Sequence, residues 1–285
     1  MQPDGKVSLE PFFLESPQGP LFAVLHRPAD GQPWHGNVLC CMPFNEEMNR
    51  CRTMTTGLAQ QLVPAGWGVL VVDLLGTGDS AGEYRDARWD LWLDNLSQAR
   101  NWLQQRPGGC NALLGIRLGA ILAAELHARL ADAGLRLILW QPVVDGKTHL
   151  TQFMRVRIAA NMDRTDLPRE TTATMREQWA RGEDVEIAGY ALHAELAAAI
   201  DRAQLSAHAM PAGTPLLWLE HAADADATLS PATQRLLAQW PGAQVTPTVQ
   251  QFNGPAFWQV HERVEAPQAV EATARWLLAS GAAHA

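Results

Sequence analysis

Short apolar runs alternate with helical patterns along most of the chain, and this alternation restricts the possible folds more than any other feature. Five runs follow one another in the sequence: GNVLCCMPF, GVLVVDLLG, CNALLGI, LRLILWQP and PLLWLEHA. Uninterrupted runs of this length are typical of strands whose two faces are both covered by helices. The intervening segments place apolar residues three and four positions apart, which indicates amphipathic helices. We therefore expect an α/β fold with a mostly parallel, doubly wound sheet and right-handed crossovers.

The remaining segments extend this pattern. PFFLES and LFAVLHRP flank the turn signal PQGP, so they predict an antiparallel pair of strands near the N-terminus. Near the C-terminus, PATQRLLAQW predicts a helix, AQVTPTVQQF a strand and APQAVEATARWLLASG a last helix. The alternation is interrupted between about Gly146 and Pro211, where helices are expected at residues 148–162, 169–182 and 193–204 with no strand between them. This stretch predicts a helical insertion after the sixth strand.

Composition narrows the class of protein. With 285 residues, 47% of them hydrophobic and 18% charged, the chain is expected to bury one substantial core. The formal net charge of −8 argues against nucleic acid or an anionic membrane as a main partner, and no apolar run is long enough to span a bilayer. The four cysteines form neither a disulfide framework nor a zinc pattern, and the N-terminus shows no signal peptide. We expect a cytoplasmic protein without a cofactor or metal.

The segment NALLGIRLGAILAAELHARL combines a strand, a Gly-x-x-x-Gly turn and a helix. It has the outline of a nucleophile elbow, the G-x-S-x-G turn that presents a catalytic serine above a sheet. Gly115, Ile116, Leu118 and Gly119 fit this outline, but the residue at the apex is Arg117. A guanidinium stays protonated at physiological pH and offers no nucleophilic lone pair, so Arg117 cannot replace the serine.

DLLGTGDSAG resembles the D-x-x-G-x-G-x-S loop that follows the fourth strand in many α/β hydrolases. Together with the elbow and the order of the strands, it makes nearly the whole chain similar to the α/β-hydrolase superfamily. The resemblance implies an α/β-hydrolase fold in a single domain. Residues 1–145 and 211–285 are then the core, and residues 146–210 are a helical cap, or lid.

A narrower resemblance rests on four segments, MPFNEEMNRCR, GIRLGA, LWQPVVDGK and GYALHAEL. They are similar to the exosortase A system-associated hydrolase 2 family, whose members accompany bacterial exosortase and exopolysaccharide loci. The resemblance implies that an arginine at the apex belongs to the family and that exosortase-system proteins are candidate partners. The family name asserts hydrolysis, which rests on analogy of fold.

The histidine of a Ser-His-Asp triad is also missing from its expected place, although the expected turn does contain candidates for the acid. The acid is expected in the turn HAADADAT, where Asp224 is the candidate and Asp226 lies beside it. The histidine is expected in a Gly-x-x-His turn, but Phe257 or Trp258 holds that place and His261 follows later. The sequence therefore predicts that a serine triad is absent.

Arg117 is instead expected to bind an anion. The apex lies at a helix N-terminus, where backbone N–H groups and the helix dipole favour negative charge, and a guanidinium binds carboxylate, phosphate or sulfate bidentately. A buried guanidinium needs a partner, and Glu46 or Glu47 in MPFNEEMNRCR is the internal candidate. The predicted ligand-binding residues are Arg117, Asn45, Arg52, Ile116, Leu118 and Trp258, and the predicted catalytic residues are Glu46, Glu47, Asp224 and His261.

Three hypotheses remain open. The first is a protein that binds or hydrolyses an anionic small-molecule or glycan-linked ligand of the exosortase system, with Glu46, Glu47 or His261 activating water. A glutamate paired with arginine is expected to have a lowered pKa, which makes it a poorer base. The second is a binding or accessory protein without catalysis, in which a Glu–Arg pair only holds the loops together. The third is an esterase that uses Ser80 or Cys41 as its nucleophile.

Overall fold

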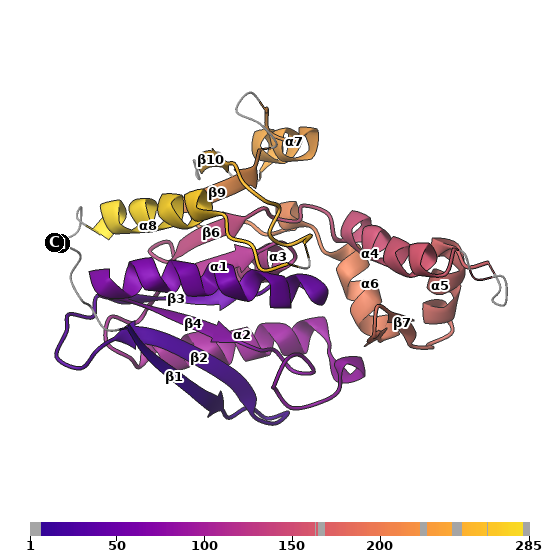
Figure 1. Cartoon of the computed structure of the whole chain (residues 1–285), viewed down its shortest axis with the longest axis horizontal. Helices are drawn as coiled ribbons and strands as arrows, with labels where there is room; N and C mark the ends of the chain where they lie inside the picture. Colours follow the sequence, from indigo (N-terminus) through magenta and orange to yellow (C-terminus); the bar gives the residue numbers. More distant parts are fainter. Residues whose placement is uncertain are drawn as a thin grey trace.

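The computed structural model describes residues 7–162, 164, 169–222, 227–240, 247–260 and 262–281. Its centre is a sheet of eight strands in the order β1-β2-β4-β3-β5-β6-β9-β10 (Figure 1). The strands are β1 (Val7–Leu14), β2 (Leu21–Pro28), β3 (Gly36–Cys41), β4 (Trp67–Val72), β5 (Cys110–Ile116), β6 (Arg136–Trp140), β9 (Leu216–His221) and β10 (Thr248–Phe252). β2 runs antiparallel to β1 and β4, and the other pairs are parallel. The predicted mostly parallel α/β architecture is confirmed.

Helices cover both faces of the sheet, because neighbouring residues of a strand point to opposite faces. In β3, Val38 and Cys40 pack with α1 and α8, whereas Leu39 and Cys41 pack with α2 and α3. Every residue of β3 and of β4 is buried, as expected for strands covered on both sides. The helices are α1 (Glu46–Leu62), α2 (Trp89–Gln104), α3 (Gly119–Leu130), α4 (Gly146–Ala160), α5 (Thr172–Ala180), α6 (Ala194–Arg202), α7 (Pro231–Gln239) and α8 (Pro267–Gly281).

The segment between β6 and β9 contains α4, α5 and α6, as predicted, and also a hairpin that was not predicted. Its strands β7 (Val185–Ile187) and β8 (Tyr190–Leu192) are antiparallel. Ala188 and Gly189 form the turn, with φ angles of 52° and 86°, and two positive φ angles are typical of tight hairpin turns. Strands of three residues are too short to show a period of two in the sequence. Figure 1 shows α4, α5 and α6 grouped at one end of the sheet.

The first helix, α1, begins at Glu46, within the segment MPFNEEMNRCR. Glu46 and Glu47 therefore lie in its first turn, where carboxylates interact favourably with the helix dipole. The loop after β3 ends at Asn45, which precedes the helix with φ 53° and ψ −128°. Residues other than glycine rarely adopt a positive φ of this kind, so the backbone is strained at the point where the loop enters the helix.

The turn between β5 and α3 lies directly against the end of β3. A β-carbon at Gly119 would lie 2.1 Å from the carbonyl oxygen of Cys41 and 2.5 Å from that of Met42. These distances are far below van der Waals contact, so the turn can approach β3 only because residue 119 is glycine. The approach fixes the height of the turn above the sheet.

We predict that Gly119→Ala lowers the free energy of unfolding by at least about 2 kcal/mol, because the added methyl group forces the turn away from β3. Gly134→Ala is the matched control, since its β-carbon would meet the Asp132 carboxylate at 3.3 Å and no backbone atom. Urea denaturation of both variants is the measurement. Equal losses of stability would contradict the close approach.

Candidate functional site

Arg117 occupies the tight turn between β5 and α3. Its φ angle is 54°, in the left-handed region that residues other than glycine seldom adopt. Its backbone N–H donates to the carbonyl of Trp140 at 3.0 Å, and its carbonyl accepts from the N–H of Ala120 at 3.0 Å and of Val143 at 3.1 Å. The turn is therefore tied to the end of β6 and to the start of α3. This geometry is the sharp strand-to-helix turn expected from the sequence.

The Arg117 guanidinium is paired with Glu47. Its Nε donates to Oε1 and Oε2 of Glu47 at 3.1 and 3.2 Å, and its Nη2 donates to Oε1 at 3.1 Å. Nη1 makes a longer contact of 3.4 Å to the carbonyl oxygen of Gln141. The two side chains are only 14% and 17% exposed. Of the two partners considered from the sequence, an internal carboxylate or a bound anion, this structure contains the carboxylate.

Trp258 covers the other side of the guanidinium. Its ring centre lies 5.2 Å from the Arg117 guanidinium carbon, within the range of a cation–π interaction. Trp258 is 4% exposed, and Arg50 donates hydrogen bonds to its carbonyl and to that of Gln259, at 3.2 and 3.1 Å. One of the two residues expected in the place of the triad histidine therefore packs on the arginine.

The net shift in the pKa of Glu47 is opposite to the one expected from the sequence. Burial raises the pKa of Glu47, and this effect exceeds the opposing attraction of Arg117. Pairing with Arg117 does act to lower the pKa of Glu47, as expected, but the expected net decrease does not occur because desolvation by burial raises this pKa by more. A carboxylate with a raised pKa holds a proton more readily and is a stronger base than an ordinary glutamate.

A cleft of about 280 Å³ lies between the start of α1, Arg117 and the inserted segment. We call it the lid cleft; its principal lining residues are Phe44, Asn45, Glu47, Arg117, His149 and Phe153. Its walls come from the loop after β3, the first turns of α1, the elbow and α4. The site residues predicted on the loop and at the elbow are thus brought together by the fold.

His149 on α4 was not predicted. It is 7% exposed, and its ring centre lies 5.9 Å from that of Phe44 in an edge-on arrangement. Burial, helped by the nearby charge of Arg117, lowers the pKa of His149 from 6.5 to about 3. Its Nε2 has no hydrogen-bond partner among the described residues. Apolar periodicity identified the helix, but it could not indicate that its first turn faces the elbow.

Asn45 also lines the lid cleft. It is 6% exposed, and its side chain makes no capping hydrogen bond to α1. Neither side-chain atom has a well-aligned hydrogen bond among the described residues. The amide lies beside the Tyr84 hydroxyl, whose pKa is raised well above its usual value by burial. Asn45 was predicted to bind ligand.

Glu46 connects the hairpin to α1. Its Oε1 accepts a hydrogen bond from the Tyr190 hydroxyl at 3.2 Å, and Arg50 lies 3.8 Å from its Oε2. Burial and the neighbouring carboxylate raise the pKa of Tyr190 to about 12. The Glu46 side chain is 43% exposed. It is therefore better placed to bind the β7–β8 hairpin to α1 than to act as a buried base.

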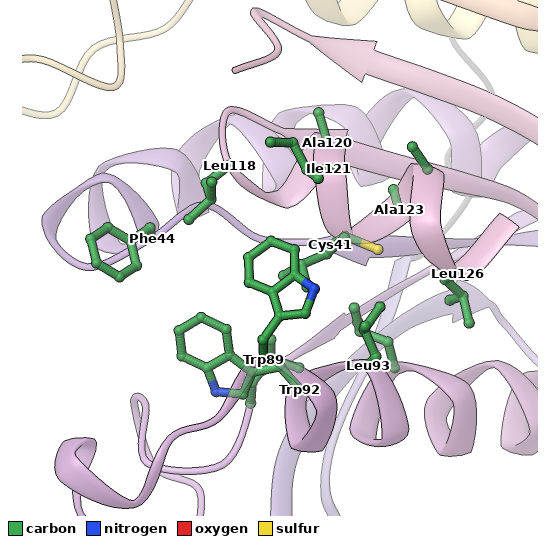
Figure 2. Close-up of a cluster of buried hydrophobic side chains, with 14 of the residues drawn as sticks. Cys41, Phe44, Trp89, Trp92, Leu93, Leu118, Ala120, Ile121, Ala123 and Leu126 are labelled. Atoms are coloured by element: carbon green, nitrogen blue, oxygen red, sulfur yellow. The ribbon is translucent and has the colours of Figure 1, made fainter. Parts of the chain in front are cut away.

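Four predicted ligand-binding residues do not line the lid cleft: Trp258, which packs on the Arg117 guanidinium, and Arg52, Ile116 and Leu118. Arg52 donates to both oxygens of the buried Asp73 carboxylate, at 2.8 and 2.9 Å. Ile116 is completely buried beneath the elbow, and Leu118 points into the core between α2 and α3 (Figure 2). Only the backbone of Leu118 is available at the turn, and its N–H has no acceptor among the described residues.

The alternative nucleophiles are engaged elsewhere. The Ser80 hydroxyl donates to the carbonyl of Asp73 at 2.6 Å and accepts from the N–H of Phe22 at 2.8 Å, so it fixes its own loop. Cys41 has no exposed surface, and burial raises its pKa well above the usual value. Figure 2 shows Cys41 inside the apolar cluster. A thiol in this environment is not activated.

The remaining candidates, Asp224 and His261, lie outside the described residues. Within the described residues, no three histidine, cysteine or acidic side chains are grouped so that they could hold a metal ion. In the same part of the chain, no helix has both the length and the apolar character that crossing a bilayer requires.

The fold is shared with solved α/β hydrolases. Est1E from Butyrivibrio proteoclasticus, with ferulic acid bound, is 14% identical with a TM-score of 0.68, and the match covers 94% of this chain and 98% of that one. A carboxyl esterase from Bacillus coagulans is 13% identical with a TM-score of 0.61, covering 96% and 99%. XC6422 from Xanthomonas campestris, a serine hydrolase without a lid, is 18% identical with a TM-score of 0.56, covering 96% and 93%. These likenesses define an α/β-hydrolase fold.

Residues 33–250 match the family described as serine aminopeptidase, S33. The match spans more than half of the chain, and the protein belongs to this family. No curated protein matches the sequence. The matched range includes the elbow, the start of α1 and the inserted segment, and it ends before Trp258.

We predict that His149 makes folding sensitive to acid. The His149 imidazole binds a proton near pH 6.5 in the unfolded chain but only at about pH 3 in the folded protein. Stability from this residue is therefore complete above pH 6.5 and is lost as the pH falls toward 3, by up to about 1.4 kcal/mol per pH unit. Urea denaturation of His149→Phe across this range is expected to show a shallower loss than the wild type. The exposed His35→Phe is the control, and identical slopes in all three proteins would contradict the assignment.

Proposed function

We propose that this protein binds a small amphipathic ligand in the lid cleft and does not form an acyl-enzyme. The observation that carries the proposal is the bidentate pair of Arg117 and Glu47 at the elbow. A serine at this position would attack a carbonyl group, whereas a permanently protonated guanidinium has no lone pair with which to do so. The pair also fills the space in which a nucleophile and its base would work.

The pairing supports binding over catalysis for an energetic reason. Removing one partner of a buried ion pair leaves an uncompensated charge and typically costs about 3–5 kcal/mol. A ligand that displaced Glu47 from Arg117 would have to supply that energy. The ligand is therefore expected to bind beside the intact pair, against the polar and aromatic side chains of the loop after β3 and of α4.

The similarity to the exosortase A system-associated hydrolase 2 family supports a proposal about the biological setting. We infer that the ligand or partner belongs to the exosortase and exopolysaccharide machinery and that the protein works in the cytoplasm. An anionic intermediate is the ligand that an unpaired Arg117 would favour. Because Arg117 is already paired with Glu47, such a ligand is expected to bind beside the intact pair and not to displace Glu47.

A second candidate function is hydrolysis by an activated water. The raised pKa of Glu47 favours it, since a carboxylate with a raised pKa is a stronger base toward water. The resulting hydroxide would add to a substrate carbonyl carbon, and the N–H of Leu118 would stabilise the oxyanion. Collapse of the intermediate would return the proton to the leaving group.

Activity-based labelling tests the proposal. We predict that the wild type reacts neither with a fluorophosphonate nor with a thiol-directed probe and does not turn over p-nitrophenyl acetate, because among the described residues no activated hydroxyl or thiol lines the lid cleft. Labelling that disappears in Ser80→Ala or Cys41→Ala would contradict the proposal. Turnover that survives both probes and is lost in Glu47→Gln would select the second candidate. Glu47→Gln keeps an oxygen that accepts from Arg117, so it retains part of the pairing.

A further inference from the structure

The connection between β10 and α8 begins with Asn253 and Gly254, both of which are exposed at the surface. The side-chain amide of an asparagine can be attacked by the backbone nitrogen of the residue that follows it. The attack is least hindered when that residue is glycine, which has no β-carbon. Asn253 is the only asparagine of the sequence that precedes glycine.

Hydrogen bonds hold the backbone on both sides of this pair and leave the attacking nitrogen free. The N–H of Asn253 donates to Oε1 of Gln268 on α8 at 2.8 Å, and the carbonyl of Gly254 accepts from Nε2 of His221 at 2.7 Å. Neither the N–H of Gly254 nor the Asn253 side-chain amide has a hydrogen-bond partner among the described residues. The two groups that would react therefore have no existing contact to break.

The space around Gly254 is also open. A β-carbon there would meet nothing nearer than Ala266, at 3.8 Å, and the φ angle of 123° is one that residues other than glycine rarely adopt. Ring closure requires the Asn253 side chain to turn toward the Gly254 nitrogen. The exposed position of both residues allows this movement without displacing the core.

The other exposed asparagines lack these properties. Asn49 and Asn101 lie within α1 and α2, where the next backbone N–H is part of the helical hydrogen-bond pattern. Arg50 and Trp102 follow them, and both have large side chains. Asn101 is therefore a suitable internal control, because it is as accessible to water as Asn253 but is held in a helix.

His221 connects the exposed pair to the elbow. Its ring lies edge-on to Trp258 with ring centres 5.6 Å apart, and Trp258 covers the Arg117 guanidinium. The His221 N–H also donates to Oε1 of Gln141 at 2.6 Å, and the Gln141 carbonyl contacts Arg117 Nη1 at 3.4 Å. The hydrogen bond to the Gly254 carbonyl thus orients a ring that packs against the aromatic cover of Arg117.

We propose that Asn253 is a site of spontaneous deamidation and that its isoaspartate product loosens the packing of His221 on Trp258. The Gly254 nitrogen bonds to Asn253 Cγ, and the amide nitrogen leaves as ammonia with the proton lost by Gly254. Water then adds to either carbonyl carbon of the resulting succinimide and opens the ring. One opening gives aspartate, and the other gives isoaspartate, whose main chain runs through the former side chain. Water is the only reactant consumed.

The two products have different consequences for the fold. Isoaspartate adds one carbon to the main chain between the points that Gln268 and His221 hold, so the Gly254 carbonyl moves away from His221 Nε2. Aspartate adds the same negative charge without lengthening the main chain. Asn253→Asp therefore separates the effect of the charge from the effect of the longer main chain.

Peptide mass spectrometry with an isoaspartate assay tests the site. The purified protein is incubated at mildly alkaline pH beside a synthetic peptide of the sequence VQQFNGPAF. Residue 253 of the folded protein is expected to convert to aspartate and isoaspartate, whereas Asn101 is expected to remain unchanged. Asn253→Gln is expected to show no conversion over the same period, because its longer side chain would have to close a six-membered ring.

Thermal unfolding of the incubated samples tests the consequence. The incubated wild type is expected to melt about 2 °C below the fresh protein, as for the loss of one hydrogen bond. Fresh Asn253→Asp and incubated Asn253→Gln are expected to melt with the fresh wild type. His221→Phe keeps a ring against Trp258 but has no donor for Gly254, so incubation is expected to convert residue 253 without a further fall in melting temperature.

Three results would overturn the inference. The first is an intact Asn253 in the folded protein after the peptide has converted completely. The second is the same fall in melting temperature in incubated Asn253→Gln as in the incubated wild type. The third is that fall in fresh Asn253→Asp, which would assign the effect to charge. These results do not depend on ligand binding or on covalent labelling, so they are distinguishable from failure of the proposed function.

Discussion

The ion pair between Arg117 and Glu47 joins the parts of the molecule on which the lid cleft depends. Arg117 sits on the turn between β5 and α3, and Glu47 sits in the first turn of α1, so the pair ties the elbow to the helix that follows β3. Both neighbouring turns are strained, with positive φ angles at Asn45 and Arg117. Side-chain pairing across the cleft holds the two strained turns at a fixed separation, while Trp258 covers the guanidinium on its other side.

The pair also sets the electrostatics of the cleft. The charge of Arg117 is balanced by Glu47, yet it still disfavours a proton on His149, whose pKa burial lowers further. The same burial raises the pKa of Glu47. Desolvation therefore moves both titratable groups toward their neutral forms. The site therefore differs from an oxyanion site, in which donors await a developing negative charge.

The sequence predicted the strands, the elbow and the helical insertion because each has a local signature: uninterrupted apolar runs, glycine spacing and helical periodicity. It could not choose between Glu46 and Glu47, because that choice depends on where α1 begins and how its first turn faces the elbow. It missed His149 for the same reason, since a histidine among apolar residues says nothing about what lies opposite. Arg52 was expected in the cleft from its position near the glutamates, but one and a half helical turns rotate it toward Asp73.

A double-mutant cycle on unfolding free energy tests the central pairing most directly. Arg117→Met and Glu47→Gln are each expected to destabilise the protein, by up to about 3 kcal/mol, because each leaves a buried polar or charged partner unmatched. The double variant is expected to lose at least about 1 kcal/mol less than the sum of the two single losses, as contacting residues of a network do. Strictly additive losses would contradict the account, since they would mean that Arg117 and Glu47 do not stabilise each other.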